Sequence, residues 1–400
     1  MSRCRLRLPP FPSQEAVASG LECVFPDDEL AARMARLRVV MQQQRLDGLV
    51  LTGAENIFWL TGRQTPGHFA FQALFAPLDG DPFMIVRQLE EMNCRANTRL
   101  ADIRTYADDE APADVLVAAI TDLGWRHRRI ATEMRGAGLT PAAFVRLAAC
   151  APDLHDASAL VGALRAVKSP LEIDFIEQAA RYADAGLEAG IAAIRVGESE
   201  NAIAAAMMQG AVAAGSEYVG MEPLVSSGPR SGVPHATWRR RRLAAGDGLF
   251  LELAGCHNRY HAAILRPVWL GPMPDEARHM LEAAQAGLAA ALEALRPGAT
   301  CADVHRAAES AIDRHGFAAA YRKRTGYSMG VAFAPDWGEG DVLSLYRGVE
   351  RPLEPGMAFH IPTTLRAYGR FTIGVSETAV VTRDGPRCLS RIPRRLFELS

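Results

Sequence analysis

Glu252 stands in the middle of the apolar run "LFLELAG", residues 249–255. An unpartnered carboxylate in a buried strand costs free energy, so its presence there needs a reason. Two interpretations are open. Glu252 is either a catalytic group, as a nucleophile or as the base for a water molecule, or one half of a buried ion pair, with Arg266 as its partner.

Two histidines accompany this acid. His235 lies in "VPHAT", and His261 follows Glu252 by nine residues. An imidazole exchanges protons near neutral pH, so His235 is a candidate proton shuttle. If residues around 252 and 261 form a regular hairpin, His261 meets Glu252 across the strands and orients it or acts as a second acid. The alternatives are a hydrogen-bonded loop histidine for His235 and a core histidine for His261.

The elements that must position these residues follow two patterns. The first part of the chain alternates helical and strand patterns, which is typical of an α/β domain. A helix is expected at 29–46, and strands are expected at 47–53, 71–78 and 82–87.

A boundary follows near residue 165. Ser169, Pro170 and Glu172 in "KSPLE" form an N-cap, a first helical position and a capping box. We therefore predict domains at 1–164 and 165–400. The second domain has an α+β layout, with helices at 171–194, 199–214, 274–294 and 301–315 and strands at 223–228 and within 248–270.

The amino-acid composition excludes several classes of function for this chain. A chain of 400 residues with 49% apolar and 22% charged residues suits two globular domains. The net charge of −2 argues against nucleic acid as a partner, and the run of arginines after Trp238 is expected to be a solvated hairpin tip. No apolar run reaches transmembrane length, and "MSRCRLRLPPFPSQ" lacks a signal-peptide core. Seven scattered cysteines without a CxxC pair indicate a cytoplasmic protein without disulfides or structural zinc.

Several motifs then occur in a familiar order. "KSPLE", "VPHAT", "LEPGMAF" and "TAVVTRDG" resemble the pita-bread superfamily of creatinase, aminopeptidase P and methionine aminopeptidase. The first half, with "NIFWLTG", looks like the creatinase-type N-terminal domain. The resemblance covers about residues 25–395. It implies a creatinase-like α/β domain followed by an α+β pita-bread catalytic domain.

The resemblance also bears on whether the protein binds metal. Metal-dependent members hold two divalent ions with two Asp, one His and two Glu. The matching positions in this chain are Glu252, Ala263, Tyr327, Pro362 and Ser376. Since at most two oxygen ligands remain, we predict no functional metal and no cofactor.

A narrower similarity concerns the chemistry. "ELAGCHNRYHA", "PHATW", "GYSMG", "PDWGE" and "EPGMAFH" are similar to the ectoine hydrolase branch, whose members open a cyclic amidine by C–N hydrolysis without metal. By this resemblance Glu252 is the nucleophile or base and His235 occupies the proton-shuttle position. Residues 363–370, "TTLRAYGR", and Gly374, where that branch tends to carry an acid, depart from the pattern and leave the exact substrate open.

Three further residues are candidate substrate-binding groups. Glu339 in "DWGE" matches the position of a carboxylate-binding arginine in creatinase, so an acid there suits a cationic amidinium. The alternative is an exposed loop acid. Tyr327, in the metal-histidine position, either hydrogen-bonds the substrate or fills space. Glu377 follows Ser376, and a shift of one residue on a strand turns a side chain to the other face.

The leading prediction is a metal-independent C–N hydrolase for a small zwitterionic amidine or guanidine. The alternatives are a metal-dependent Xaa-Pro-type aminopeptidase or lyase, and an inactive binding homologue. We also expect a homodimer, because creatinase-type relatives complete each pocket with the partner's N-terminal domain. "NIFWLTG" and "PGHFAF" are candidates for that wall, or else ordinary core. The expected partner is a small-molecule substrate, with neither nucleic acid nor membrane.

Overall fold

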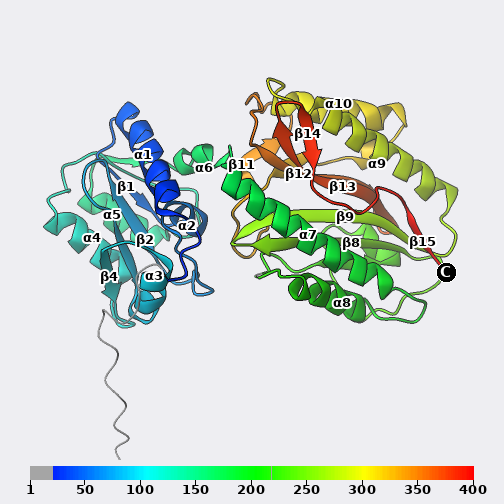
Figure 1. Cartoon of the computed structure of the whole chain (residues 1–400), viewed down its shortest axis with the longest axis horizontal. Helices are drawn as coiled ribbons and strands as arrows, with labels where there is room; N and C mark the ends of the chain where they lie inside the picture. Colours follow the sequence, from blue (N-terminus) through cyan, green and yellow to red (C-terminus); the bar gives the residue numbers. More distant parts are fainter. Residues whose placement is uncertain (1–20, 218) are drawn as a thin grey trace, which may run out of the picture. The chain divides into compact units, whose positions relative to one another are not determined.

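The chain folds into two units that divide between Leu164 and Arg165 (Figure 1). The computed structural model describes residues 21–217 and 219–400. The two units are described separately below.

A six-stranded sheet forms the centre of the N-terminal unit, with the strand order β4-β3-β2-β1-β5-β6. β1 runs antiparallel to β2 and parallel to β5. Every residue of β1 and β2 is buried, as expected for strands covered on both faces. The strands are β1 Gly48–Leu51, β2 Ala73–Pro77, β3 Phe83–Arg87, β4 Asp102–Tyr106, β5 Ile130–Thr132 and β6 Leu154–Asp156.

Helices alternate with these strands, which confirms the predicted α/β class. They are α1 Asp27–Gln43, α2 Ala54–Thr61, α3 Glu91–Asn97, α4 Pro112–Asp122, α5 Pro141–Cys150 and α6 Leu160–Arg165. The segment "NIFWLTG" forms most of α2, and its Phe58 and Trp59 have no exposed surface. These two rings are therefore core of their own unit, whereas Phe69 of "PGHFAF" is 83% exposed.

The C-terminal unit begins with a long helix, α7, Pro170–Ala192. Its N-terminus has the predicted capping box, in which Ser169 and Glu172 satisfy each other's backbone amides. α7 packs on the β8–β9 hairpin, as Figure 1 shows. The other helices are α8 Glu200–Ala213, α9 Asp275–Ala294 and α10 Cys301–Arg314.

Two sheets make up the rest of this unit, in the orders β11-β10-β12-β13-β14 and β15-β9-β8-β7. Their strands are β7 Leu224–Ser227, β8 Gly248–His257, β9 Tyr260–Leu270, β10 Gly326–Ser328, β11 Glu339–Leu345, β12 Ala358–Ala367, β13 Phe371–Thr382, β14 Gly385–Cys388 and β15 Phe397–Leu399. This is the predicted α+β layout.

Side chains of β13 join the two sheets. The hydroxyl of Ser376 accepts a hydrogen bond from the backbone amide of Leu265 at 2.7 Å. The hydroxyl of Thr378 accepts from the amide of Ala263 at 3.1 Å and donates to its carbonyl at 2.8 Å. These bonds hold β13 against β9, and they place the inner faces of β8, β9, β12 and β13 in one site.

Two sequence expectations concern the chain as a whole. Within residues 21–217 and 219–400, no helix combines the length and the apolar character that crossing a bilayer requires. In those ranges Cys23, Cys94, Cys150, Cys301 and Cys388 are free thiols, and Cys4 lies outside the described residues.

Candidate functional site

Glu252 lies on β8, directly opposite Leu265 of β9, and its side chain is 9% exposed. Its Oε1 lies 3.9 Å from Nε2 of His360 on β12. Burial raises the pKa of Glu252, while the charges of Lys323 and Arg366 pull that pKa down. The suggested ion pair with Arg266 is wrong, because Arg266 turns to the other face of the sheet.

A chain of hydrogen bonds orients His360. The indole Nε1 of Trp337 donates to the Tyr327 hydroxyl at 2.8 Å, and that hydroxyl lies 2.9 Å from Nδ1 of His360. An indole N–H can only donate, so the Tyr327 hydroxyl accepts the bond from Trp337. The hydroxyl therefore donates its own proton to Nδ1 of His360. This assigns the proton of neutral His360 to Nε2, on the side of Glu252. Burial lowers the pKa of His360 well below its usual range, and Lys323 and Arg266 lower it further, so the ring is neutral near pH 7.

Two cations, Lys323 and Arg366, act electrostatically on Glu252. We name these five residues the Glu252 cluster: Glu252, Lys323, Tyr327, His360 and Arg366. Lys323 precedes β10, and burial lowers its pKa to about 7 against the opposing charge of Glu252. Arg366 lies six residues after His360 on β12, so both side chains leave the same face.

Three members of this cluster were not predicted from the sequence: Lys323, His360 and Arg366. For His360 and Arg366 a signal existed, since they stand at even spacing from Pro362, a predicted site position on the same strand. For Lys323 we find no such signal, because it lies outside any strand.

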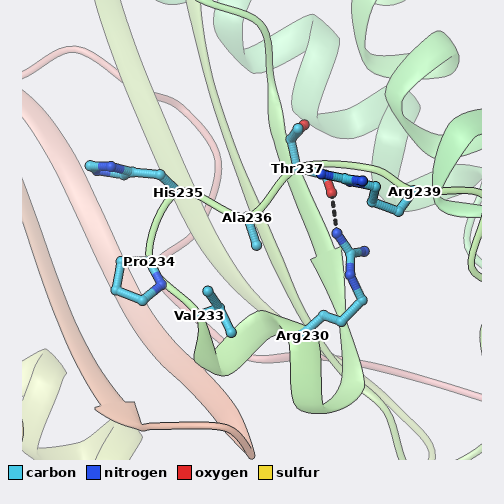
Figure 2. A pocket seen from close by; sticks show the side chains of 7 residues that line it. All are labelled: Arg230, Val233, Pro234, His235, Ala236, Thr237 and Arg239. Carbon is cyan, nitrogen blue, oxygen red and sulfur yellow. Dashed lines mark hydrogen bonds between the residues drawn. The ribbon is translucent and has the colours of Figure 1, made fainter.

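His235 lines a surface pocket of about 490 Å³. Its φ of 55° lies in the left-handed region, which is uncommon for a residue other than glycine. Figure 2 shows the imidazole on the opposite side of the loop from Arg230, whose guanidinium donates to the Thr237 carbonyl at 2.5 Å. No hydrogen bond or ion pair between described residues joins His235 to Glu252. The other lining residues are Val233, Pro234, Ala236 and Arg239.

His261 does not meet Glu252. The hairpin register places His261 opposite Cys256, four residues along β9 from Leu265, which is about 13 Å at the usual rise of a strand. The ring is 1% exposed, and its Nδ1 lies 3.0 Å from the Arg259 carbonyl. Burial lowers the pKa of His261 to about 4. The expected cross-strand contact is therefore wrong, and His261 is a neutral core histidine.

Glu339 also has a different environment from the one predicted. It is 4% exposed and pairs with Arg165 at 2.6 Å and with Lys168 at 2.7 Å. It also accepts from the Ser328 hydroxyl and the Val331 amide. Burial alone would raise the pKa of Glu339, but the two cations outweigh burial and lower the pKa to about 2. Glu339 is neither a substrate-binding group nor an exposed loop acid; its carboxylate is fully engaged in a buried ion-pair network.

Glu377 points away from the Glu252 cluster, as its one-residue offset from Ser376 requires. Its carboxylate pairs with Arg266 at 2.8 Å and with Arg394 at 2.9 Å. The prediction of Glu377 as a substrate-binding residue is therefore wrong.

Comparison with known proteins shows the family of this chain. Residues 174–383 match the family described as Metallopeptidase family M24, and residues 33–167 match the Creatinase/Prolidase N-terminal domain. The chain belongs to metallopeptidase family M24. It is thus a hydrolase of family M24 with a creatinase-type N-terminal domain, as the sequence motifs predicted.

Several M24 relatives extend along nearly the whole chain. Ectoine hydrolase of Halomonas elongata is 30% identical over 395 residues, covering 93% of this chain and 98% of the relative. An uncharacterized hydrolase/peptidase of Sinorhizobium fredii is 29% identical over 387 residues, with coverage of 93% and 98%. Dipeptidase PepE from Mycobacterium ulcerans superposes with a TM-score of 0.80 at 27% identity, over 94% of this chain and 99% of that chain. Prolidase from Thermococcus sibiricus, at 21% identity and a TM-score of 0.83 over 92% and 99%, shows the same fold. These matches confirm the predicted pita-bread architecture.

The family description implies metal, but the residues present do not fit a divalent ion. At the five positions that the resemblance assigns to ligands, Glu252 is the one carboxylate, and Ala263 and Pro362 offer no side-chain donor. The Ser376 hydroxyl is engaged with β9. Among the described residues, no group of three or more His, Cys, Asp or Glu side chains is arranged to hold a metal. The positive charges of Lys323 and Arg366, which act electrostatically on Glu252, are the opposite of what a metal dication needs.

Proposed function

We propose that this M24 hydrolase opens a C–N bond of a small zwitterionic cyclic amidine or guanidine-type compound without a metal, in the manner of ectoine hydrolase. The observation that carries the proposal is the Glu252 cluster. A buried carboxylate stands next to a neutral imidazole of fixed tautomer, in a metal-ligand position of the fold. The ectoine hydrolase of Halomonas elongata, similar over nearly the full chain, supports this chemistry.

Glu252 supplies the reactive oxygen in one of two ways. As a base, it takes a proton from water while the water oxygen adds to the amidinium carbon, and burial favours this role because it raises the pKa of Glu252. As a nucleophile, it adds to that carbon itself, and water then releases the product. In both routes the ring C–N bond breaks as the nitrogen takes up a proton, so one water yields an amide and an amine.

His360 and Tyr327 prepare Glu252 for this step. The Trp337–Tyr327–His360 chain assigns a proton to Nε2 of His360, which lies 3.9 Å from the carboxylate of Glu252. We assign proton exchange with the leaving nitrogen to Lys323, whose pKa of about 7 lies near working pH. His235, exposed on its loop beside the pocket, is proposed as the shuttle between this site and solvent.

A second candidate function is a metal-dependent Xaa-Pro dipeptidase, because relatives of this chain carry dipeptidase names. The lack of a fitting donor set counts against it. One experiment separates the two functions and the inactive homologue. The purified protein is assayed on a panel of cyclic amidines and of Xaa-Pro dipeptides, after EDTA treatment and again with Mn, Zn or Co restored. Amidine hydrolysis after EDTA supports the proposal, peptide hydrolysis only with metal supports the dipeptidase, and no hydrolysis of either supports a binding protein.

We further propose a cytoplasmic homodimer. Phe69, 83% exposed at a loop of the N-terminal unit, is the apolar side chain that a second copy would cover.

A further inference from the structure

We propose that Glu200 is a positioning residue for His235, because its carboxylate binds both ends of the loop 228–239 that carries the imidazole. The inference rests on the proposed function, in which His235 moves protons between the site and solvent. Glu200 is the first residue of α8 and has no exposed surface. A buried carboxylate costs free energy unless donors surround it, so the donors around Glu200 account for its presence.

Four donors meet the Glu200 carboxylate, and all of them belong to the loop or to the residue before it. Oε1 accepts from the backbone amide of Ser227 at 2.9 Å and from its hydroxyl at 2.7 Å. Oε2 accepts from the backbone amide of Arg239 at 2.9 Å and from the guanidinium of Arg230, with which it forms an ion pair. Ser227 immediately precedes the loop and Arg239 ends it, so one side chain closes the loop at both ends.

Arg230 extends this restraint to the residues beside His235. Its Nη2 donates to the carbonyl of Thr237 at 2.5 Å, two residues after His235 (Figure 2). The Thr237 hydroxyl also donates to the Pro223 carbonyl at 3.1 Å. The backbone that follows His235 is therefore held by two bonds, one of which leads through Arg230 to Glu200.

The His235 ring depends on this backbone for its position. The residue is exposed, and no hydrogen bond or ion pair with a described residue holds the imidazole. Its φ of 55° lies in the left-handed region, which costs free energy for a residue with a Cβ and persists where the surrounding structure enforces it. The bonds that close the loop on Glu200 supply that enforcement.

The same bonds fix the loop relative to Glu252. The loop leaves β7 after Ser227, and Leu224 of the same strand pairs directly with Glu252 of β8. The end of the loop that Glu200 holds is thus continuous with the strand beside Glu252. Loss of the Glu200 carboxylate should therefore change where His235 lies with respect to Glu252, while the pairing of β7 with β8 stays in place.

The first test uses Glu200→Gln in the full-length protein and needs no substrate. An amide has one oxygen and turns its NH2 group toward the remaining donors, so part of the loop closure must open. We expect amide hydrogen exchange within 228–239, measured by mass spectrometry, to become at least about tenfold faster. The NMR signal of the His235 ring, identified by its loss in His235→Ala, should shift or broaden.

The matched control is Glu198→Gln. Glu198 stands two residues before Glu200 and also accepts from a backbone amide, that of Ser199 at 2.9 Å. Its other bond is an ion pair with Arg195, so neither partner belongs to the loop. Glu198→Gln should leave the exchange of the loop and the ring signal of His235 unchanged.

A second variant covers the case in which Glu200→Gln fails to fold. The side chain of Arg230 is 31% exposed, so Arg230→Gln is expected to be tolerated. It removes the bond to Thr237 and leaves Glu200 its two backbone donors. Exchange should then rise in the part of the loop that follows His235, and the ring signal should again shift or broaden.

A double-mutant cycle tests whether Glu200 acts through His235 in the reaction. For the best amidine, Glu200→Gln should lower kcat by about tenfold or more with KM within about threefold, because small displacements of a catalytic group slow the chemical step. In the His235→Ala background the same substitution should cost less than about twofold, since the group that Glu200 positions is gone. A purely structural residue would lower the thermal midpoint and slow both backgrounds by the same factor.

An unchanged exchange rate and ring signal in Glu200→Gln, or equal losses of kcat in the two backgrounds, would overturn the inference. A protein that hydrolyses no amidine would refute the proposed function. In that case the exchange rates and the ring signal would still decide whether Glu200 holds His235 in place.

Discussion

Nε2 of His360 lies 3.9 Å from Oε1 of Glu252. This nitrogen carries the proton of the ring because Nδ1, on the opposite side of the ring, accepts a hydrogen bond from Tyr327, which in turn accepts one from Trp337. A polar chain of this kind fixes one tautomer without any charged partner. Burial keeps the imidazole neutral, so the Nε2–H of His360 faces Glu252 without forming a charged pair with it.

Glu252→Gln should lower turnover of the best amidine by about a hundredfold or more, a few kcal/mol of barrier lowering. The thermal midpoint should stay close to that of the unchanged protein, because no charged group depends on Glu252 as its only hydrogen-bond partner. Initial rates and thermal unfolding decide the matter. The control is Glu339→Gln, which leaves Arg165 and Lys168 uncompensated and should cost about 3–5 kcal/mol of stability. A near-normal rate in Glu252→Gln would refute the mechanism.

Tyr327→Phe removes the hydroxyl that connects Trp337 to His360. The imidazole then loses its fixed tautomer, and we expect kcat to fall by about tenfold or more with a smaller change in KM. A nitrogen NMR spectrum of the ring, recorded with labelled histidine, should show a mixture of tautomers where the unchanged protein shows one. A single, unchanged tautomer with reduced kcat would mean that Tyr327 acts on the substrate directly and not through His360.

Purified protein should carry less than about one equivalent of Mn, Zn, Co or Fe and should keep its activity after EDTA treatment. The reason is the replacement of ligand positions by Ala263, Tyr327 and Pro362. Metal content by mass spectrometry and rates before and after chelation are the measurements. Stoichiometric metal whose removal abolishes activity would show that the donor-set argument is wrong.

His261 predicts a stability change in acid. Its pKa is lowered from 6.5 to about 4 in the folded protein, so between these values the unfolded chain binds a proton that the folded chain does not. The free energy of unfolding should therefore fall as the pH falls from about 6.5 to about 4, by up to about 3 kcal/mol from this residue. His261→Asn keeps a donor for the Arg259 carbonyl and should show a shallower fall. Identical acid dependence in the two proteins would contradict the assignment.

The chain should be a homodimer by light scattering at micromolar concentration, and Phe69→Ser should weaken the dimer. Phe69 is 83% exposed and would be covered by the second copy. Val145→Ser, at a residue 63% exposed in the same unit, is the control and should leave the dimer intact. A monomer at that concentration would count against a shared site.

Local rules predicted much of the fold because the signals were local. The capping box of Ser169 and Glu172 predicted the start of α7, and the domain class followed from the order of helical and strand patterns. The register of the β8–β9 hairpin follows from the position of its turn. Asn258 and Arg259 both have positive φ and form a two-residue turn, and counting outward from them pairs Glu252 with Leu265 and not with His261.

The rest of the site depends on pairings between distant segments. Tyr327 was singled out for its position, but its bond to His360 arises only when β10 pairs with β12. Glu339 looked available because Arg165 and Lys168 lie more than 170 residues earlier in the chain. No spacing rule connects such residues, so a sequence indicates the candidate charges without saying which of them are already paired.

The bonds from Ser376 and Thr378 to the backbone of β9 affect whether substitutions could build a metal site here. In this chain they fasten the two sheets at the place where metal-dependent relatives would gather ligands. An acid at residue 376 would remove the hydroxyl that accepts from the Leu265 amide, and no bound ion would yet offset the loss of that hydrogen bond. An acid at residue 263 would be placed beside Thr378. Each single substitution toward a metal centre is therefore unfavourable until the other substitutions are also made. A site for two divalent ions at this place would therefore require several of these positions to change together.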